Sequence, residues 1–201
     1  MCIRDSLETL NFILNHNHKP TMIGFITNYE KSKRFVKLDK LKNLINIDKK
    51  KVKFVSVLVN PDDEILEKIK DLNFDYYQLY DVNPARTKEI KSKFKKKIIT
   101  ALTISSKNDV VKYKDYSEIS DIILFDSKGY EKSESFDHSL LNILPKKLNK
   151  MIAGNIQIDD IPNFKNKDFI IDLSGALEDQ NGKKDINKID KLLNLFKENE
   201  T

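Results

Sequence analysis

The chain has 201 residues, of which 39% are hydrophobic and 33% charged, and its formal net charge is +5. This length favours a single domain over residues 1–201, and the composition excludes a disordered or fibrous protein. No apolar run approaches the length of a membrane span, and the N-terminus lacks the pattern of a secretory signal, so we expect a cytoplasmic protein with no membrane partner. The lone cysteine, Cys2, excludes an internal disulfide.

The sequence begins with a helical pattern and continues with short β-branched runs that alternate with longer helical segments. Ser6 can cap the first helix, and its apolar stripe is Leu7, Leu10, Ile13 and Leu14. Seven strand-like runs follow, at 22–26, 54–59, 76–79, 98–102, 122–125, 151–153 and 169–173. The clearest later helices are predicted at 38–45, 64–72, 85–94, 139–144 and 186–196, with weaker helical signals after Leu102 and Ala153.

This alternation predicts an α/β protein in which a parallel sheet is covered by helices. A closed (β/α)8 TIM barrel needs eight strands, each followed by a helix, whereas this chain has seven clear strands after an initial helix. We therefore predict such a barrel with its first strand missing or disrupted. An open doubly wound sheet is the alternative, but the sequence lacks the Gly-rich dinucleotide loop that is usual there.

Two short basic clusters raise the possibility of a nucleic-acid partner, because clustered lysines attract phosphates. Lys49–Lys51 and Lys95–Lys97 each precede a strand-like run and contain no aromatic residue that could stack on a base. We interpret both clusters as solvated turns and expect no nucleic-acid partner.

The ends of the strand-like runs hold the candidates for chemistry, because (β/α)8 enzymes carry their active sites at the C-terminal ends of their strands. In chain order these ends contain Ile23-Gly24-Phe25-Ile26 followed by Ser32-Lys33-Arg34-Phe35-Val36, the FVSVLVN run at 54–60, Tyr77-Gln78-Leu79-Tyr80-Asp81, Leu124-Phe125-Asp126-Ser127 followed by Phe136-Asp137-His138, Ala153-Gly154-Asn155-Ile156, and the DLSGALE run at 172–178 followed by Gly182-Lys183-Lys184-Asp185. Together they resemble the motifs of the phosphoribosylanthranilate isomerase family. The resemblance extends from about Ile23 to Asp185, and the order and spacing of the motifs make it specific.

The resemblance implies an Amadori rearrangement of N-(5-phosphoribosyl)anthranilate to 1-(2-carboxyphenylamino)-1-deoxyribulose 5-phosphate in tryptophan biosynthesis, with no metal or organic cofactor. Such chemistry needs an acid that protonates the furanose ring oxygen and a base that removes the C2 proton. The family match assigns the acid to Asp126, whose pKa must then be raised by desolvation. Judged by spacing alone, Asp126 could instead cap the following turn or pair with a lysine.

The base of the family is a cysteine that ends the first strand and precedes a glycine. Cys2 lies at nearly the family spacing before the first-helix acid Glu8, but Ile3 stands in place of the glycine. A thiol becomes a base only where a fixed position beside positive charge or a helix terminus lowers its pKa, and a frayed terminus does not supply one. Two interpretations of Cys2 therefore stay open. It is either the catalytic base, or a residue without a catalytic role in a non-native leader of about residues 1–6.

The other matched positions imply a site for a small phosphorylated substrate. Arg34 matches the residue that binds the anthranilate carboxylate, a role that suits a planar guanidinium, although a surface arginine is the alternative. Gln78 and Tyr80 are expected near the substrate, with Tyr80 in place of the usual histidine, and Asp172 is expected to bind a hydroxyl. Backbone N–H groups of small-residue turns would bind the phosphate, unless these are simple turns, at Gly154, Asn155, Ser174, Gly175 and Ala176.

Two other functions stay open. A related phosphate-binding barrel of the same pathway would need a lysine at a strand end as its acid, and Lys97 instead precedes its strand. The second is a non-catalytic barrel that binds anions. His16, His18 and His138 show no metal-ligand spacing, so we expect no metal site. The oligomeric state is left undetermined.

Overall fold

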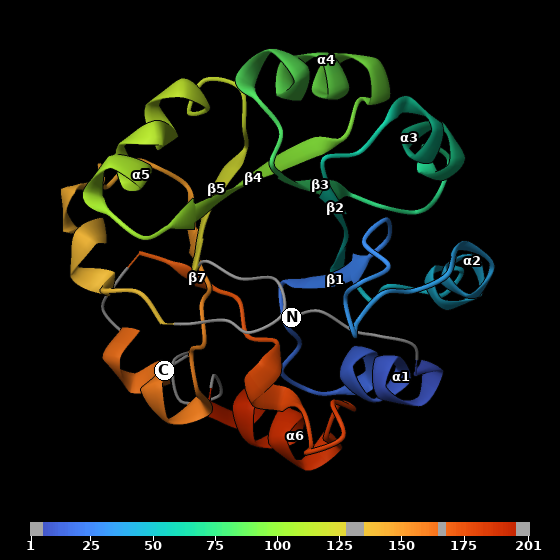
Figure 1. The fold of residues 1–201 in the computed structure, drawn as a ribbon. Coiled ribbons are helices and arrows are strands. Elements are labelled where there is room, and N and C mark those ends of the chain that lie inside the picture. The colour runs from blue at the N-terminus through green and yellow to red at the C-terminus, as the bar shows by residue number, and fades with distance from the viewer. Residues whose placement is uncertain (1–5, 128–134, 165–167, 196–201) are drawn as a thin grey trace.

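The structure is a computed structural model that describes residues 6–127, 135–164 and 168–195. Seven parallel strands form one sheet in the order β1-β2-β3-β4-β5-β6-β7, so that each strand pairs with its neighbours in the chain. Figure 1 shows the sheet curled around a central axis, with the helices on its outside. The predicted α/β barrel architecture with seven strands is therefore confirmed.

All seven predicted runs are strands. Their bounds are β1 (Met22–Ile26), β2 (Lys53–Val59), β3 (Tyr76–Tyr80), β4 (Lys97–Ile104), β5 (Ile122–Ser127), β6 (Lys150–Ile152) and β7 (Ile170–Ile171). The last strand is shorter than the predicted 169–173. The reason is its partner, because β6 has three residues and offers β7 a ladder of only two pairs, Met151 with Ile170 and Ile152 with Ile171.

Six α-helices and four 3-10 helices precede, connect or follow the strands in the described parts of the chain. They are α1 (Leu7–Asn15), α2 (Leu38–Ile45), α3 (Asp63–Ile69), α4 (Pro84–Phe94), α5 (Lys107–Val111), α6 (Ile186–Leu195), η1 (Lys112–Asp115), η2 (His138–Ile143), η3 (Ile158–Phe164) and η4 (Gly175–Leu177). Side-chain caps begin several of the α-helices: Ser6 accepts a hydrogen bond from the Thr9 N–H at 3.1 Å, and Asn83 accepts one from the Arg86 N–H at 2.9 Å. None of these helices has the length and apolar character that crossing a membrane requires.

The helix predicted at 139–144 is the 3-10 helix η2 rather than an α-helix. Leu144 precedes Pro145 and has an extended backbone, because a residue before proline is pushed out of the helical region. The segment therefore ends before an α-helix can propagate. Pro162 lies inside η3, in a segment for which we predicted only a weak helical signal.

Two apolar clusters show which strand faces point inward. On β5, Ile123 and Phe125 pack in the layer between sheet and helices, whereas Ile122 and Leu124 pack inside the barrel. Side chains alternate along a strand, so Asp126 shares the inward face with Ile122 and Leu124. The strand pattern thus directs the predicted acid toward the barrel interior.

The strands β1 and β7 form the two edges of the described sheet. A cavity of about 460 Å³ has lining residues from both edges, from the barrel interior and from α6, among them Gly24, Gln78, Ile171 and Leu192. Within the described residues, this cavity thus extends from the barrel interior to the edges of β1 and β7. Residues 1–5 of the predicted leader, Cys2 among them, lie outside the described residues.

Candidate active site

Every predicted site residue that the structure describes, apart from Gln78, lies at or just beyond the C-terminal end of a strand. Tyr80 ends β3, Asp126 is the penultimate residue of β5, Asp172 follows β7, and Arg34 lies in the loop after β1. The small-residue turns follow β6 and β7. Since the strands are parallel, these ends share one rim of the barrel. Gln78 lies deeper in β3, buried on the wall of the cavity.

The Asp126 carboxyl group receives a hydrogen bond on each oxygen. The Tyr80 hydroxyl donates to Oδ2 at 2.7 Å, and the Ser127 backbone N–H donates to Oδ1 at 2.8 Å. Burial raises the pKa of Asp126 to about 6, with the negative charge of Asp172 acting in the same direction, although both hydrogen bonds and Arg34 oppose the rise. A carboxyl group with this pKa can give and take a proton near neutral pH.

Tyr80 contacts the candidate acid directly. Its side chain is buried, and its hydroxyl accepts a hydrogen bond from Gln78 Nε2 at 3.3 Å while donating to Asp126. Side chains two apart along a strand share a face, as Gln78 and Tyr80 do on β3, but the sequence contained no signal for the bond to Asp126. That contact arises because β3 and β5 both pair with β4 and so carry their inward side chains to neighbouring positions.

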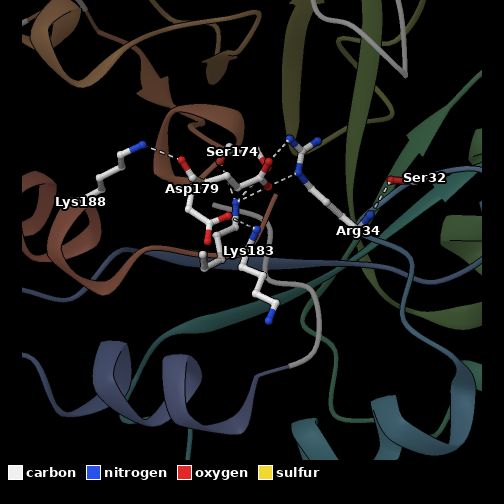
Figure 2. Close-up of polar contacts among 8 residues, drawn as sticks. Ser32, Arg34, Ser174, Asp179, Lys183 and Lys188 are labelled. Atoms are coloured by element: carbon white, nitrogen blue, oxygen red, sulfur yellow. Dashed lines mark hydrogen bonds and ion pairs between the residues drawn. The ribbon is translucent and has the colours of Figure 1, made fainter. Parts of the chain in front are cut away.

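Arg34 is held at the rim by Glu178, which follows η4. The guanidinium donates from Nε to Glu178 Oε1 at 2.5 Å and from Nη2 to Oε2 at 2.9 Å. The backbone of Arg34 is also fixed, since its N–H donates to the Ser32 hydroxyl at 3.1 Å (Figure 2). Glu178 was not among the predicted site residues, and its place in the last motif was the one signal that could have found it.

The turn after β6 requires glycine at its first position. Gly154 has φ +97°, and a Cβ added there would lie 2.9 Å from the Cβ of Ser127, the residue after Asp126. Asn155 also has a left-handed backbone, with φ +53°, which asparagine tolerates better than most residues. Close packing of this turn against the end of β5 therefore brings it beside the candidate acid.

The turn after β7 lies beside Arg34. Ser174 precedes η4, which contains Gly175 and Ala176, and a Cβ added to Gly175 would lie 3.5 Å from Arg34 Nη2. The first N–H groups of a helical turn have no partner within the helix and are available to anions. Asp172 extends the β6–β7 pairing, since its N–H donates to the Ile152 carbonyl at 2.8 Å, and its side chain lines the cavity.

Cys2, the predicted base, lies outside the described residues. Within the ranges that the structure describes, no three His, Cys, Asp or Glu side chains gather closely enough to hold a metal ion.

A parallel α/β barrel whose C-terminal rim carries a buried acid of raised pKa, on the same rim as an arginine, defines the class of (β/α)-barrel enzymes. The sequence profile of N-(5'-phosphoribosyl)anthranilate (PRA) isomerase matches residues 3–195. The chain belongs to the phosphoribosylanthranilate isomerase family, as its motifs predict.

Individual relatives agree with this membership. The N-(5'-phosphoribosyl)anthranilate isomerase of Rhizobium rhizogenes is 31% identical over 189 residues, which cover 89% of this chain and 85% of that protein. The crystal structure of the isomerase from Thermotoga maritima has a TM-score of 0.83 at 21% identity, covering 98% of this chain and 97% of the other. Another isomerase structure, in complex with reduced 1-(o-carboxyphenylamino)-1-deoxyribulose 5-phosphate, has a TM-score of 0.82 at 22% identity, covering 98% and 96%.

Proposed function

We propose that this protein isomerises N-(5'-phosphoribosyl)anthranilate to 1-(2-carboxyphenylamino)-1-deoxyribulose 5-phosphate, a step of tryptophan biosynthesis. The observation that carries the proposal is the buried Asp126 carboxyl group of raised pKa, on the same rim as Arg34 and the two small-residue turns. Membership of the isomerase family supports it, and the chain covers most of the length of its relative from Rhizobium rhizogenes.

The proposed acid step uses Asp126 in its protonated form. Asp126 gives its proton to the furanose ring oxygen as the bond from that oxygen to C1 breaks, and the nitrogen lone pair forms the iminium. At pH 7 a carboxyl group with a pKa near 6 is about one tenth protonated, so the acid form is present when substrate binds. A base then removes the C2 proton to give the enolamine, which tautomerises to the ketone product; we assign this step to Cys2.

Substrate binding follows from the charges of the two ends of the molecule. Arg34 binds the anthranilate carboxylate, since a guanidinium can donate two parallel hydrogen bonds to it. Backbone N–H groups of the turns at 154–155 and 174–176 bind the phosphate. Asp172 accepts a hydrogen bond from a substrate hydroxyl, and Gln78 lies below the ring. The ligand of the related complex has the same two anionic groups, a carboxylate and a phosphate.

The direct test is the loss of fluorescence of N-(5'-phosphoribosyl)anthranilate when purified protein is added in catalytic amounts. We expect multiple turnovers and formation of the ribulose phosphate product. Binding of the reduced product analogue without any turnover would instead favour the non-catalytic anion-binding barrel. The cytoplasmic location and the lack of a nucleic-acid partner stay predictions from the sequence.

Replacing Tyr80 by phenylalanine is expected to shift the pH dependence of kcat/KM. Activity should fall as pH rises above about 6, because Asp126 loses the proton that it must donate. The Tyr80 hydroxyl stabilises the ionised carboxylate and so lowers the pKa of Asp126. In Tyr80→Phe this pKa therefore rises, and the alkaline limb of the profile moves to higher pH.

The matched control is Tyr116→Phe, which removes a hydroxyl that donates to the Val82 carbonyl at 2.9 Å instead of to the acid. Its alkaline limb should stay in place. A limb that stays in place in Tyr80→Phe too, or that moves to lower pH, would show that Tyr80 does not control the proton on Asp126.

A further inference from the structure

The carboxylate of Glu178 lies at the centre of a group of charged and polar residues, which we call the Glu178 cluster. Its members are Arg34, Ser174, Glu178, Lys184 and Lys188. Figure 2 shows Arg34, from the loop after β1, extending toward the segment after β7 that carries Ser174 and Asp179. Besides its two bonds from Arg34, Glu178 accepts one on Oε1 from Lys184 Nζ at 2.9 Å. The side chains of Glu178 and Lys184 are only 13% and 4% exposed. One carboxylate is thus shared by two cations with little competition from water.

The same cluster fixes both ends of the turn after β7. Lys184 Nζ donates to the backbone carbonyl of Ser174 at 2.7 Å, at the start of the turn. Lys188 Nζ donates to the backbone carbonyl of Glu178 at 2.6 Å, at its end. The Glu178 N–H also donates to the Gly175 carbonyl at 3.0 Å. The turn that would bind the phosphate is therefore tied to the carboxylate that holds Arg34.

A tight hairpin keeps Glu178 and Lys184 side by side. The two residues form an antiparallel bridge, and the Asp179 N–H donates to the Lys183 carbonyl at 2.8 Å. The Asp179 carboxylate accepts from the N–H groups of Asn181 and Lys183 at 2.8 and 2.9 Å. Because backbone pairing in the hairpin holds Glu178 beside Lys184, the Glu178 side chain extends to Arg34 from a rigid segment.

The ion pair with Glu178 engages one side of the Arg34 guanidinium group. Its bonds to Glu178 use the edge formed by Nε and Nη2. A guanidinium has a second edge, Nη1 with Nη2, of the same two-donor geometry. Burial alone would raise the pKa of Glu178, but Arg34 and Lys184 hold it below its usual range. Glu178 is therefore ionised at neutral pH and holds Arg34 throughout the proposed reaction.

We propose that Glu178 is a positioning residue. It holds Arg34 and the 174–176 turn at a fixed distance and orientation relative to each other, so that both anionic ends of the substrate are bound at once. This inference rests on the proposed function. Two cations of the cluster, Arg34 and Lys184, share the Glu178 carboxylate, and among the described residues Asp126 and Asp172 also lie on the site side of the rim. Glu178 thus fixes the geometry of the site, and its negative charge offsets part of the positive charge there.

The test combines Glu178→Gln with Glu178→Asp, and measures steady-state kinetics together with calorimetric affinities for anthranilate and for inorganic phosphate as separate probes. Glutamine places an N–H donor against the guanidinium, and aspartate keeps the charge but shortens its reach. In both variants we expect weaker binding of both probes and a KM raised about tenfold or more, with kcat changed less than about threefold. Glu89→Gln is the matched control, since Glu89 pairs with Arg86 at 2.9 Å on the outer helix α4, and it should change none of these values.

Other outcomes overturn the proposal. Tighter binding in Glu178→Gln would show that Glu178 merely competes with the substrate for Arg34, and a lower Tm with unchanged probe affinities would show a purely structural role. If Glu178→Gln does not fold, Lys184→Met takes its place, and it must weaken phosphate binding more than anthranilate binding. Binding of anthranilate and of inorganic phosphate can be measured without turnover. An inactive wild-type chain would therefore refute the proposed function, while the binding measurements would still test the role of Glu178.

Discussion

Replacing Asp126 by asparagine is expected to lower kcat by about 10²- to 10⁴-fold, the range that a positioned general acid contributes. Asparagine has nearly the same shape and can still accept the hydrogen bond of the Tyr80 hydroxyl, but it has no acidic proton to give to the ring oxygen. KM should change little, because the charged groups that bind the two ends of the substrate stay in place. Steady-state measurement of fluorescence loss gives both constants.

Asp121→Asn is the control for this loss of turnover. Asp121 directly precedes β5, so it lies at the opposite end of the strand that carries Asp126, where it accepts a hydrogen bond from the Ile98 N–H at 2.8 Å. Its replacement should leave kcat per folded molecule nearly unchanged, whatever it does to stability. An equal loss in both variants would contradict a specific role for Asp126, as would full activity in Asp126→Asn.

The stability of Asp126→Asn should depend on pH in a defined direction. In the folded chain the pKa of Asp126 is about 6, above the ordinary value of 3.8. The stability contributed by this group is therefore present below pH 3.8 and is lost as pH rises through about 6, because the buried carboxylate then carries a charge. Thermal melts should show the variant gaining stability relative to the wild type between pH 4 and pH 8.

The second large effect is expected from a designed strand, as long as β1 and ending in Cys-Gly, that replaces residues 1–5 directly before Ser6. Ser6 is retained because its side chain caps α1. The edges of β1 and β7 could both pair with such a strand beside the 460 Å³ cavity. For a gain of about two to three net hydrogen bonds at about 1 kcal/mol each, and 2–4 °C for each kcal/mol, Tm should rise by roughly 5–10 °C. A thiol held in place beside the rim should raise kcat by about 10²-fold.

The same strand ending in Ser-Gly separates the two effects. It should raise Tm equally, because the backbone pairing is unchanged, but it should leave turnover low, since a hydroxyl is a much poorer base than a thiolate. A Cys-Gly strand that changes neither Tm nor kcat would contradict both the pairing of this strand with β1 and β7 and the requirement for a fixed thiol.

The sequence by itself determined the order of the elements and their approximate bounds. The predicted strand at 22–26 and the predicted helix at 38–45 coincide with β1 and α2, because β-branched runs and helical spacing of apolar residues act within a few residues. The motifs at the strand ends also identified the family and led to Asp126. The local sequence pattern was insufficient where the neighbouring strand limits the length of a strand. The strand β7 is an example, because its length is limited by its pairing with β6.

Only the tertiary structure decided which rim residues touch. Tyr80 and Asp126 are 46 positions apart, and Arg34 and Glu178 are 144 apart, so no local pattern relates them. Their contacts depend on strand register and on the path of each loop over the rim. The raised pKa of Asp126 has the same origin, because burial and the charge of Asp172 exist only once the barrel has formed.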